Sequence, residues 1–215
     1  TVSQALHVKR LCDDAQVDYV VLDLQQAGIA IYDSLSQTTI DEVRGKTYEG
    51  FTVMSHYSLD DKLILELRER TLSPNAKPMI YPILASQRLN NDIAVSFRTS
   101  LQKKLWNFLI SESEAEDHLI KNSKEFIADM DDPQARAIWL APYLNTDFLI
   151  TESINLELNL INGIIKLTEP AGALKDRYSM ISYGNWFISF LDKDLIKEGD
   201  NTSDWEAILA VSNVY

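Results

Sequence analysis

The chain has 215 residues, of which 46% are hydrophobic, and it carries a formal net charge of −12 at pH 7. This size suits one domain with a sizeable core, and so acidic a chain repels nucleic acid at long range, which argues against a protein that reads DNA sequence directly. A single cysteine, Cys12, excludes an internal disulfide and is typical of a reducing compartment, and no apolar run has the length of a membrane span.

The first part of the chain alternates helical and strand patterns. Residues 3–14 have helical spacing, residues 19–23 form a short apolar run typical of a buried strand, and helical spacing returns over 28–37. This order is typical of a sheet covered by helices. Residues 38–51 are polar with two glycines, which indicates a loop that orders on a partner.

Prolines punctuate the next part of the chain. Residues 51–54 indicate a short strand, and Asp60 is placed to cap a helix over 61–72. Residues 79–81 predict a strand that the neighbouring prolines confine to an edge or a short length. His56 has no catalytic partner nearby in the sequence, and we interpret it as structural.

The rest of the chain is mainly helical in pattern. Helices are expected over 86–110, over 111–128, after Pro133, over 147–160 and over 174–193. Asn162-Gly163 is a turn pair, and a strand is expected over 164–167. We therefore expect a single domain over residues 1–215 with a helical insertion at roughly 86–145.

Asp23 ends the predicted strand over 19–23, and Gly28 opens the helix that follows. A carboxylate at the carboxyl end of a buried strand lies at the rim of an open α/β sheet, where ligands bind. The alternative is a strand-end turn or a helix cap.

A second acid, Asp176, lies between Lys175 and Arg177 at the start of the apolar helix predicted over 174–193. Acids near a helix N-terminus complement its dipole, so a local ion pair is one interpretation. The other is a carboxylate aimed at a metal, because Mg²⁺ and Mn²⁺ prefer oxygen ligands and two-metal phosphodiester hydrolysis draws carboxylates from separate elements.

Two stretches of the chain resemble the large terminase subunit of tailed bacteriophages. They are Val20-Val-Leu-Asp-Leu-Gln-Gln-Ala-Gly-Ile-Ala-Ile-Tyr-Asp-Ser-Leu35, followed by Ile40-Asp-Glu-Val-Arg-Gly-Lys-Thr-Tyr48, and Lys175-Asp-Arg-Tyr-Ser-Met-Ile-Ser-Tyr-Gly-Asn-Trp186. Both resemble segments of the C-terminal nuclease domain of that family, which cuts double-stranded DNA during viral genome packaging.

The resemblance implies an RNase H-like α/β fold, with a mixed sheet flanked by helices, and an endonuclease that uses Mg²⁺ or Mn²⁺. It implies that Asp23 and Asp176 are catalytic metal ligands and that Lys175 and Arg177 contact substrate. The implied partners are double-stranded DNA, the small terminase subunit, the portal protein and the packaging ATPase domain of the same polypeptide. The implied location is the host cytoplasm, without a membrane.

The chain departs from the family pattern at its start. The family's first metal-binding aspartate lies on an opening strand, whereas residues 1–17 have the pattern of the helix that follows such strands. We expect a piece that lacks the N-terminal strands. The alternatives are a catalytically incomplete nuclease fold that serves protein–protein interaction, and a small-molecule-binding α/β domain with its site at the Asp23/Gly28 turn.

Overall fold

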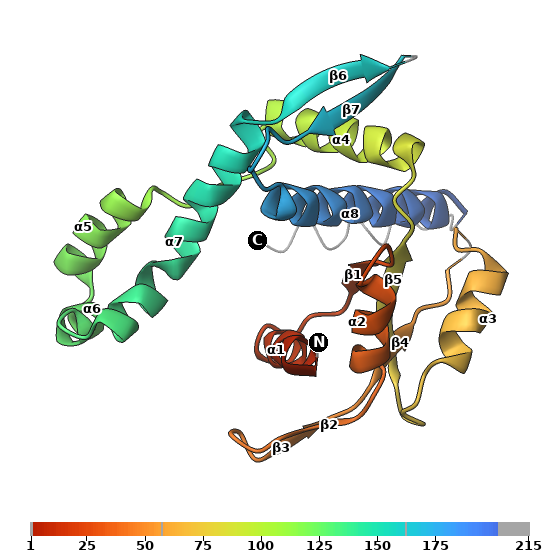
Figure 1. Ribbon diagram of the computed structural model, residues 1–215, viewed down its shortest axis with the longest axis horizontal. Coiled ribbons are helices and arrows are strands. Elements are labelled where there is room, and N and C mark those ends of the chain that lie inside the picture. The colour runs from red at the N-terminus through yellow and green to blue at the C-terminus, as the bar shows by residue number, and fades with distance from the viewer. Residues whose placement is uncertain (1, 57, 162, 202–215) are drawn as a thin grey trace. The chain divides into compact units, whose positions relative to one another are not determined.

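The computed structural model describes residues 2–56, 58–161 and 163–201, with the side chains of 194–201 left aside. The chain divides into two compact units, Thr1–Ser86 and Gln87–Tyr215. A small parallel sheet with flanking helices makes the first unit α/β, and helices with one strand pair make the second (Figure 1). The α/β class expected from the sequence is therefore confirmed.

The first unit is built around a three-stranded parallel sheet in the order β1-β5-β4. Its elements are α1 (Val2–Asp14), β1 (Val20–Asp23), α2 (Gly28–Leu35), β2 (Thr39–Asp41), β3 (Lys46–Tyr48), β4 (Phe51–Val53), α3 (Asp61–Glu69) and β5 (Lys77–Ile83). The expected helix–strand–helix opening is confirmed. The Asp60 cap is confirmed too, because its carboxylate accepts the backbone N–H groups of Lys62 and Leu63.

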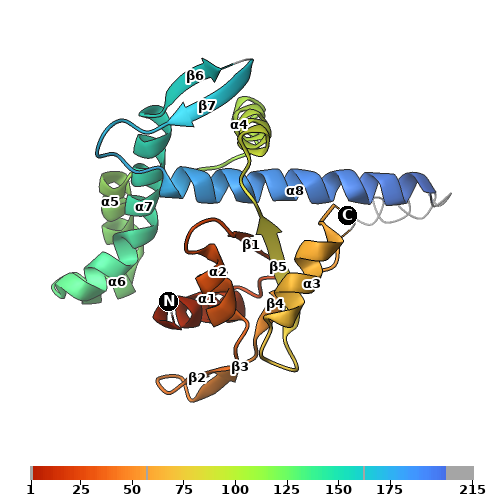
Figure 2. The same ribbon diagram turned by 45° about the vertical axis from the view of Figure 1, so that its right-hand side comes forward.

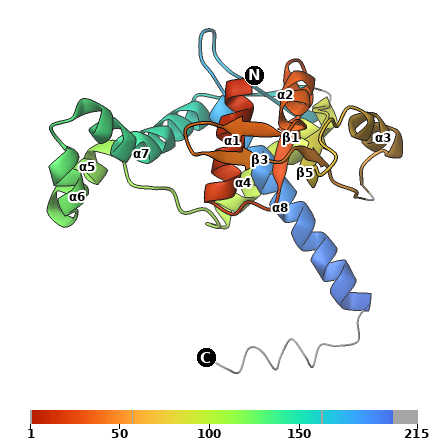
Figure 3. The ribbon, with the colours of Figure 1, turned by 90° about the horizontal axis from the view of Figure 1, so that it is seen from below.

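Helices α1, α2 and α3 lie around the strands of the first unit (Figure 3), and the core is formed by these helices and one face of the sheet. Buried side chains of α1, α2 and α3, among them Cys12, Tyr32 and Leu67, form one cluster with Val53 and Ile80 of the strands. Successive strand residues point to opposite faces, so the other face carries two neighbouring pairs from β1 and β5. These pairs are Val21 with Tyr81 and Asp23 with Ile83.

The prediction that prolines confine the strand around 79–81 to an edge or a short length is wrong, because β5 has seven residues and is the central strand. The Ile80 carbonyl accepts from Met54, so alternate residues of β5 face β4. Pro82 also faces the β4 side, but it lies beyond the last residue of β4. Its missing N–H therefore removes no hydrogen bond between the two strands. Near Pro78 the β4–β5 register shifts at Thr52/Val53.

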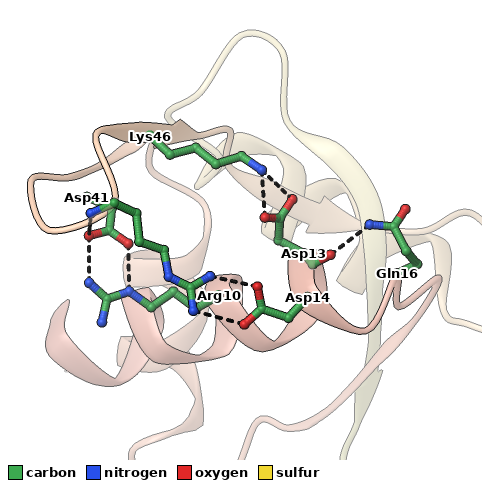
Figure 4. Close-up of polar contacts among 7 residues, drawn as sticks. Arg10, Asp13, Asp14, Gln16, Asp41 and Lys46 are labelled. Carbon is green, nitrogen blue, oxygen red and sulfur yellow. Dashed lines mark hydrogen bonds and ion pairs between the residues drawn. The ribbon is translucent and has the colours of Figure 1, made fainter.

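The prediction of a loop over 38–51 is also wrong. Strands β2 and β3 form an antiparallel hairpin, with Gly45 in the left-handed region (φ +60°) at its turn. Three ion pairs join this hairpin to the end of α1, namely Arg10–Asp41, Arg44–Asp14 and Lys46–Asp13 (Figure 4). The polar side chains that suggested a loop therefore have partners within the same unit.

The second unit is mostly helical, with one antiparallel strand pair. Its elements are α4 (Gln87–Gln102), α5 (Glu112–Asn122), α6 (Lys124–Asp129), α7 (Pro133–Ile154), β6 (Glu157–Ile161), β7 (Ile164–Thr168) and α8 (Asp176–Asn201). Helix α4 packs across α8, and β7 packs on α4 (Figure 2). The strand expected over 164–167 is confirmed.

Three helical expectations in this unit are wrong in part. The helix expected over 86–110 ends at Gln102, and the stretch expected as helix over 147–160 divides between α7 and β6. The helix expected over 111–128 is divided at Ser123, which ends α5 and caps α6. Asn162 lies outside the described residues, whereas its turn partner Gly163 has φ +77°. No helix in the described ranges is both long and apolar enough to cross a membrane.

Candidate active site

Asp23 lies at the carboxyl end of β1, where the sequence predicts it. Its Oδ1 accepts the backbone N–H of Gln25 at 2.9 Å, which turns the chain out of the strand. The side chain of Gln25 then donates to the carbonyl of Ala85 at 2.6 Å, just beyond β5. The aspartate is thus held at the carboxyl edge of the parallel sheet, the edge where ligands bind in open α/β sheets.

Gly28, the first residue of α2, allows the helix to begin in close contact with the end of β1. A Cβ on residue 28 would lie 1.9 Å from the carbonyl oxygen of Asp23, closer than any real contact. The Gly28 N–H donates to the Gln25 carbonyl at 2.8 Å, so the chain from Asp23 to Gly28 is one tight turn. Only glycine permits this close approach of helix to strand.

A small polar cluster lies at the carboxyl ends of β4 and β5. The Nδ1 atom of His56 accepts the backbone N–H of Ser58 at 3.2 Å and lies 2.8 Å from the Ser58 hydroxyl. That hydroxyl lies 3.0 Å from the hydroxyl of Tyr81, and the rings of His56 and Tyr81 meet edge to face. Because the three strands are parallel, this cluster and Asp23 share one edge of the sheet.

Asp176 is the first residue of α8 and is exposed. In the part of the chain that the structure describes, its carboxylate forms no hydrogen bond or ion pair. The backbone N–H groups of the next two residues, Arg177 and Tyr178, both donate to Oε2 of Glu152, at 2.8 and 3.1 Å. Glu152 on α7 therefore caps α8 from a different helix, and it leaves the Asp176 carboxylate available.

The two cations beside Asp176 both have carboxylate partners. Lys175 pairs with Glu169 at 2.6 Å. The Arg177 guanidinium donates to Oε1 of Glu152 at 2.8 Å and to the amide oxygen of Asn145 at 3.2 Å, and it lies over the ring of Phe148. Arg177 thus ties α8 to α7, and contact with a phosphate would require it to leave these partners.

These contacts set the charge states of both carboxylates. Burial alone would raise the pKa of Glu152, but hydrogen bonds from the Arg177 side chain and from the Tyr178 and Arg177 backbones outweigh it and lower that pKa. The hydrogen bond from Lys175 lowers the pKa of Glu169. Both acids are therefore ionised at neutral pH and hold the cations next to Asp176.

The four residues that the sequence singles out fall in different parts of the chain. Asp23 belongs to the first unit, whereas Lys175, Asp176 and Arg177 belong to the second. A metal ion shared by Asp23 and Asp176 would need the units to bring the two acids together. Within residues 2–56, 58–161 and 163–201, no group of three or more His, Cys, Asp or Glu side chains has a metal-binding arrangement.

A cavity of about 470 Å³ lies within the second unit, and Lys175, which precedes Asp176 in the chain, lines it. Helix α4, the β6–β7 pair and the start of α8 enclose it. Sequence analysis missed this cavity, because only tertiary packing joins its walls. It also missed Glu152, whose one sequence signal is a single acid among the apolar residues at the end of α7.

Comparison with known proteins gives no match. No family model, no curated protein and no solved structure resembles this chain significantly.

Proposed function

We propose that this chain is the nuclease region of a tailed-bacteriophage terminase large subunit, an endonuclease that cuts double-stranded DNA with Mg²⁺ or Mn²⁺. In this proposal the β1-β5-β4 sheet is the parallel part of an RNase H-like mixed sheet. The carrying observation is the Asp23 turn, with an acid at the carboxyl end of a parallel strand and a glycine whose Cβ would collide with the Asp23 carbonyl.

The chemistry of the two acids fits a hard divalent ion. Asp23 and Asp176 offer carboxylate oxygens, the ligands that Mg²⁺ and Mn²⁺ prefer. When bound, such ions supply positive charge that activates water and stabilises the charge developing on a phosphodiester. The protein's part is to hold the two carboxylates, through the Gln25 N–H at Asp23 and through the Glu152 cap behind Asp176.

The supporting sequence is the pair of terminase-like stretches, each of which contains one of the acids. In such a packaging machine the partners would be double-stranded DNA, the small terminase subunit, the portal protein and the ATPase domain of the same polypeptide. The site would work inside the host cell.

The test is nicking of supercoiled plasmid by the chain in Mn²⁺, beside Asp23→Asn and Asp176→Asn. Asp18→Asn and Asp192→Asn are matched controls, because each removes one exposed carboxylate from the same unit as its target. We expect cleavage by the parent and both controls and at least about a hundredfold loss in each site variant, as for residues that act as one unit. Mn²⁺ binding by electron paramagnetic resonance provides a readout independent of cleavage.

If the parent chain is inert, the same assay is repeated with upstream coding sequence restored. Cleavage that then depends on both acids supports the proposal. Cleavage that survives both substitutions, or inactivity of the extended protein while it remains folded, overturns it.

A second function has its own support. The net charge of −12 and the carboxylate partners of Lys175 and Arg177 disfavour contact with a DNA backbone. A catalytically incomplete nuclease fold that binds proteins of the packaging machine would show these features. Copurification with portal or small terminase subunit, without metal-dependent cleavage by the extended protein, would favour this alternative.

A further inference from the structure

The cavity enclosed by α4, the β6–β7 pair and α8, here called the α4–α8 cavity, has the dimensions of a small-ligand site. Its volume of about 470 Å³ lies within the range of ligand pockets, roughly 300–1,000 Å³. All of its lining residues belong to the second unit.

The cavity wall combines apolar area with aromatic and amide groups. Ile93 and Ala94 of α4 face Ile165 and Leu167 of β7 across it. The lining residues that offer rings or amides are Tyr178, Tyr183, Gln87 and Asn90. An apolar wall with a few polar groups is typical of sites for flat heterocycles, which need both stacking area and hydrogen bonds at the ring edge.

Tyr178 and Asn90 add polar groups to the lining of the cavity. Burial raises the pKa of Tyr178 to about 12, so its hydroxyl is protonated at neutral pH. That hydroxyl makes no hydrogen bond within the described part of the chain. Asn90 accepts from the Tyr183 hydroxyl at 3.3 Å through Oδ1, which leaves its NH₂ group as a donor. The cavity therefore offers donors for a ring edge.

The rim of the cavity carries two lysines. Lys166 of β7 is exposed and has no ion-pair partner among the described residues, and Lys175 has Glu169 at 2.6 Å. The helix on the opposite wall belongs to a locally cationic segment, since residues 87–105 contain four Lys or Arg and one acid, Asp92. In an acidic chain, this is a place where an anionic ligand can approach.

We propose that the α4–α8 cavity binds one deoxynucleotide of the DNA strand at Asp176, with its base against the apolar wall and its phosphate at Lys166 and Lys175. The proposal rests on the proposed nuclease function and adds to it a contact with a single unpaired nucleotide. Lys175 lines the cavity and directly precedes Asp176 in the chain, so the cavity adjoins the start of α8. Extrusion of a base into a pocket is a known way for proteins to handle DNA.

The experiment is a titration of the chain with 2′-deoxyadenosine 5′-monophosphate in the absence of divalent metal. Ligand-observed NMR measures the binding. Deoxyadenosine and inorganic phosphate are titrated separately. We expect a dissociation constant for the nucleotide below about 1 mM, which is modest for a ligand of this size, and at least about fivefold weaker binding of either part alone.

Four variants test the geometry. Ala94→Leu fills the cavity and is expected to weaken binding at least about tenfold, since it takes the space of the base. Lys166→Ala is expected to weaken binding about fivefold, and its matched control Lys121→Ala on α5 not at all. Glu169→Gln removes the competing carboxylate from Lys175 and is expected to strengthen binding. Thermal melting checks that each variant remains folded.

The outcomes separate this proposal from the nuclease proposal, because binding is measured without metal and without cleavage. Equal binding of phosphate and nucleotide, or nucleotide binding that Ala94→Leu leaves unchanged in a folded protein, overturns the nucleotide site. No binding of any probe also overturns it. Nucleotide binding with the expected variant pattern supports the site even where plasmid cleavage fails.

Discussion

Glu152 binds Arg177 in two ways at once, through the backbone and through the side chain. One carboxylate oxygen accepts the Arg177 N–H at 2.8 Å, and the other accepts from the guanidinium at 2.8 Å. The carboxylate is nearly buried, with 9% of its side chain exposed. Through this contact a residue 25 positions earlier fixes the start of α8 and hence the position of Asp176.

Glu152→Gln is therefore expected to destabilise the second unit. The amide oxygen can still accept both backbone N–H groups, but the neutral amide cannot balance the charge of the guanidinium. We therefore expect a loss of about 1–2 kcal/mol in the free energy of unfolding, because a partly exposed pair is worth less than a buried one. Chemical denaturation followed by tryptophan fluorescence measures it. Glu157→Gln on β6 is the control, because that exposed acid has no partner in the described chain.

The same pair predicts a pH dependence. The folded-state pKa of Glu152 lies below its ordinary value of 4.5, so its stabilisation is fully present above pH 4.5 and is lost as the pH falls through the lowered pKa. The parent should lose stability over that acid range more steeply than Glu152→Gln. Parallel curves for the two proteins would contradict the assigned role of this carboxylate.

Gly28→Ala is expected to destabilise the first unit. The added methyl would lie 1.9 Å from a backbone oxygen, so α2 must move away from β1, at a cost of about 3 kcal/mol as for a severe overpacking. Gly184→Ala in α8 is a matched control, because its Cβ would meet nothing within 4 Å and alanine favours a helix by about 1 kcal/mol. Thermal melting of the parent and both variants measures the effect. A Gly28→Ala variant that melts at the same temperature as the parent would contradict the prediction, because the turn would then accommodate the methyl group without cost.

The sequence predicts Asp23 and Asp176 at the right ends of their elements because those signals are local. A β-branched run ending on an acid predicts β1, and an acid at the start of an apolar helix predicts α8. The short helix α2 is likewise recognisable from Gly28 onward.

What the sequence misses depends on contacts between distant residues. The hairpin β2–β3 looks like a loop because its charges find partners on α1, about thirty positions away. The central place of β5 depends on where β4 ends, which no pattern within 79–81 reports. The Glu152 cap and the α4–α8 cavity likewise need α7, β7 and α8 packed together.

Asp41→Asn is expected to release the hairpin from α1. The Asp41 carboxylate is fully buried and accepts two hydrogen bonds from Arg10, at 2.5 and 2.6 Å, as well as the N–H groups of Val43 and Arg44. Hydrogen exchange should show lost protection of the β2–β3 amides in this variant. Glu42→Gln, an exposed neutralisation in the same hairpin, should leave their protection unchanged.

The hairpin should also loosen in acid. The Arg10 hydrogen bond, helped by two backbone N–H groups against the effect of burial, lowers the pKa of Asp41 from 3.8 to about 2. Its stabilisation is thus complete above about pH 4 and is lost as the pH falls toward 2. Protection of the β2–β3 amides that persists at pH 2 would contradict this ion pair.

Lys9 gives the first unit a second pH dependence, of the same sign as that of Asp41 but in the alkaline range. Its ammonium is buried beneath the hairpin, donates to the Gln37 carbonyl and to the Thr39 hydroxyl (3.0 Å), and lies over the ring of Phe51. Burial lowers its pKa from 10.5 to about 8, although the charge of Glu49 opposes this shift. Between pH 8 and 10.5 the unfolded chain therefore binds more protons than the folded one, so this group's contribution to stability increases as the pH rises.

Lys9→Met removes this titration and keeps a side chain of similar length. The free energy of unfolding of the parent, relative to that of Lys9→Met, should therefore rise as the pH is raised from 8 toward 10.5. Urea denaturation at pH 7, 8, 9 and 10 measures the difference, and the subtraction removes titrations that both proteins share. Lys77→Met, at an exposed lysine on β5, should show no such trend against the parent. A constant difference between parent and Lys9→Met would mean that Lys9 keeps an ordinary pKa in the folded protein.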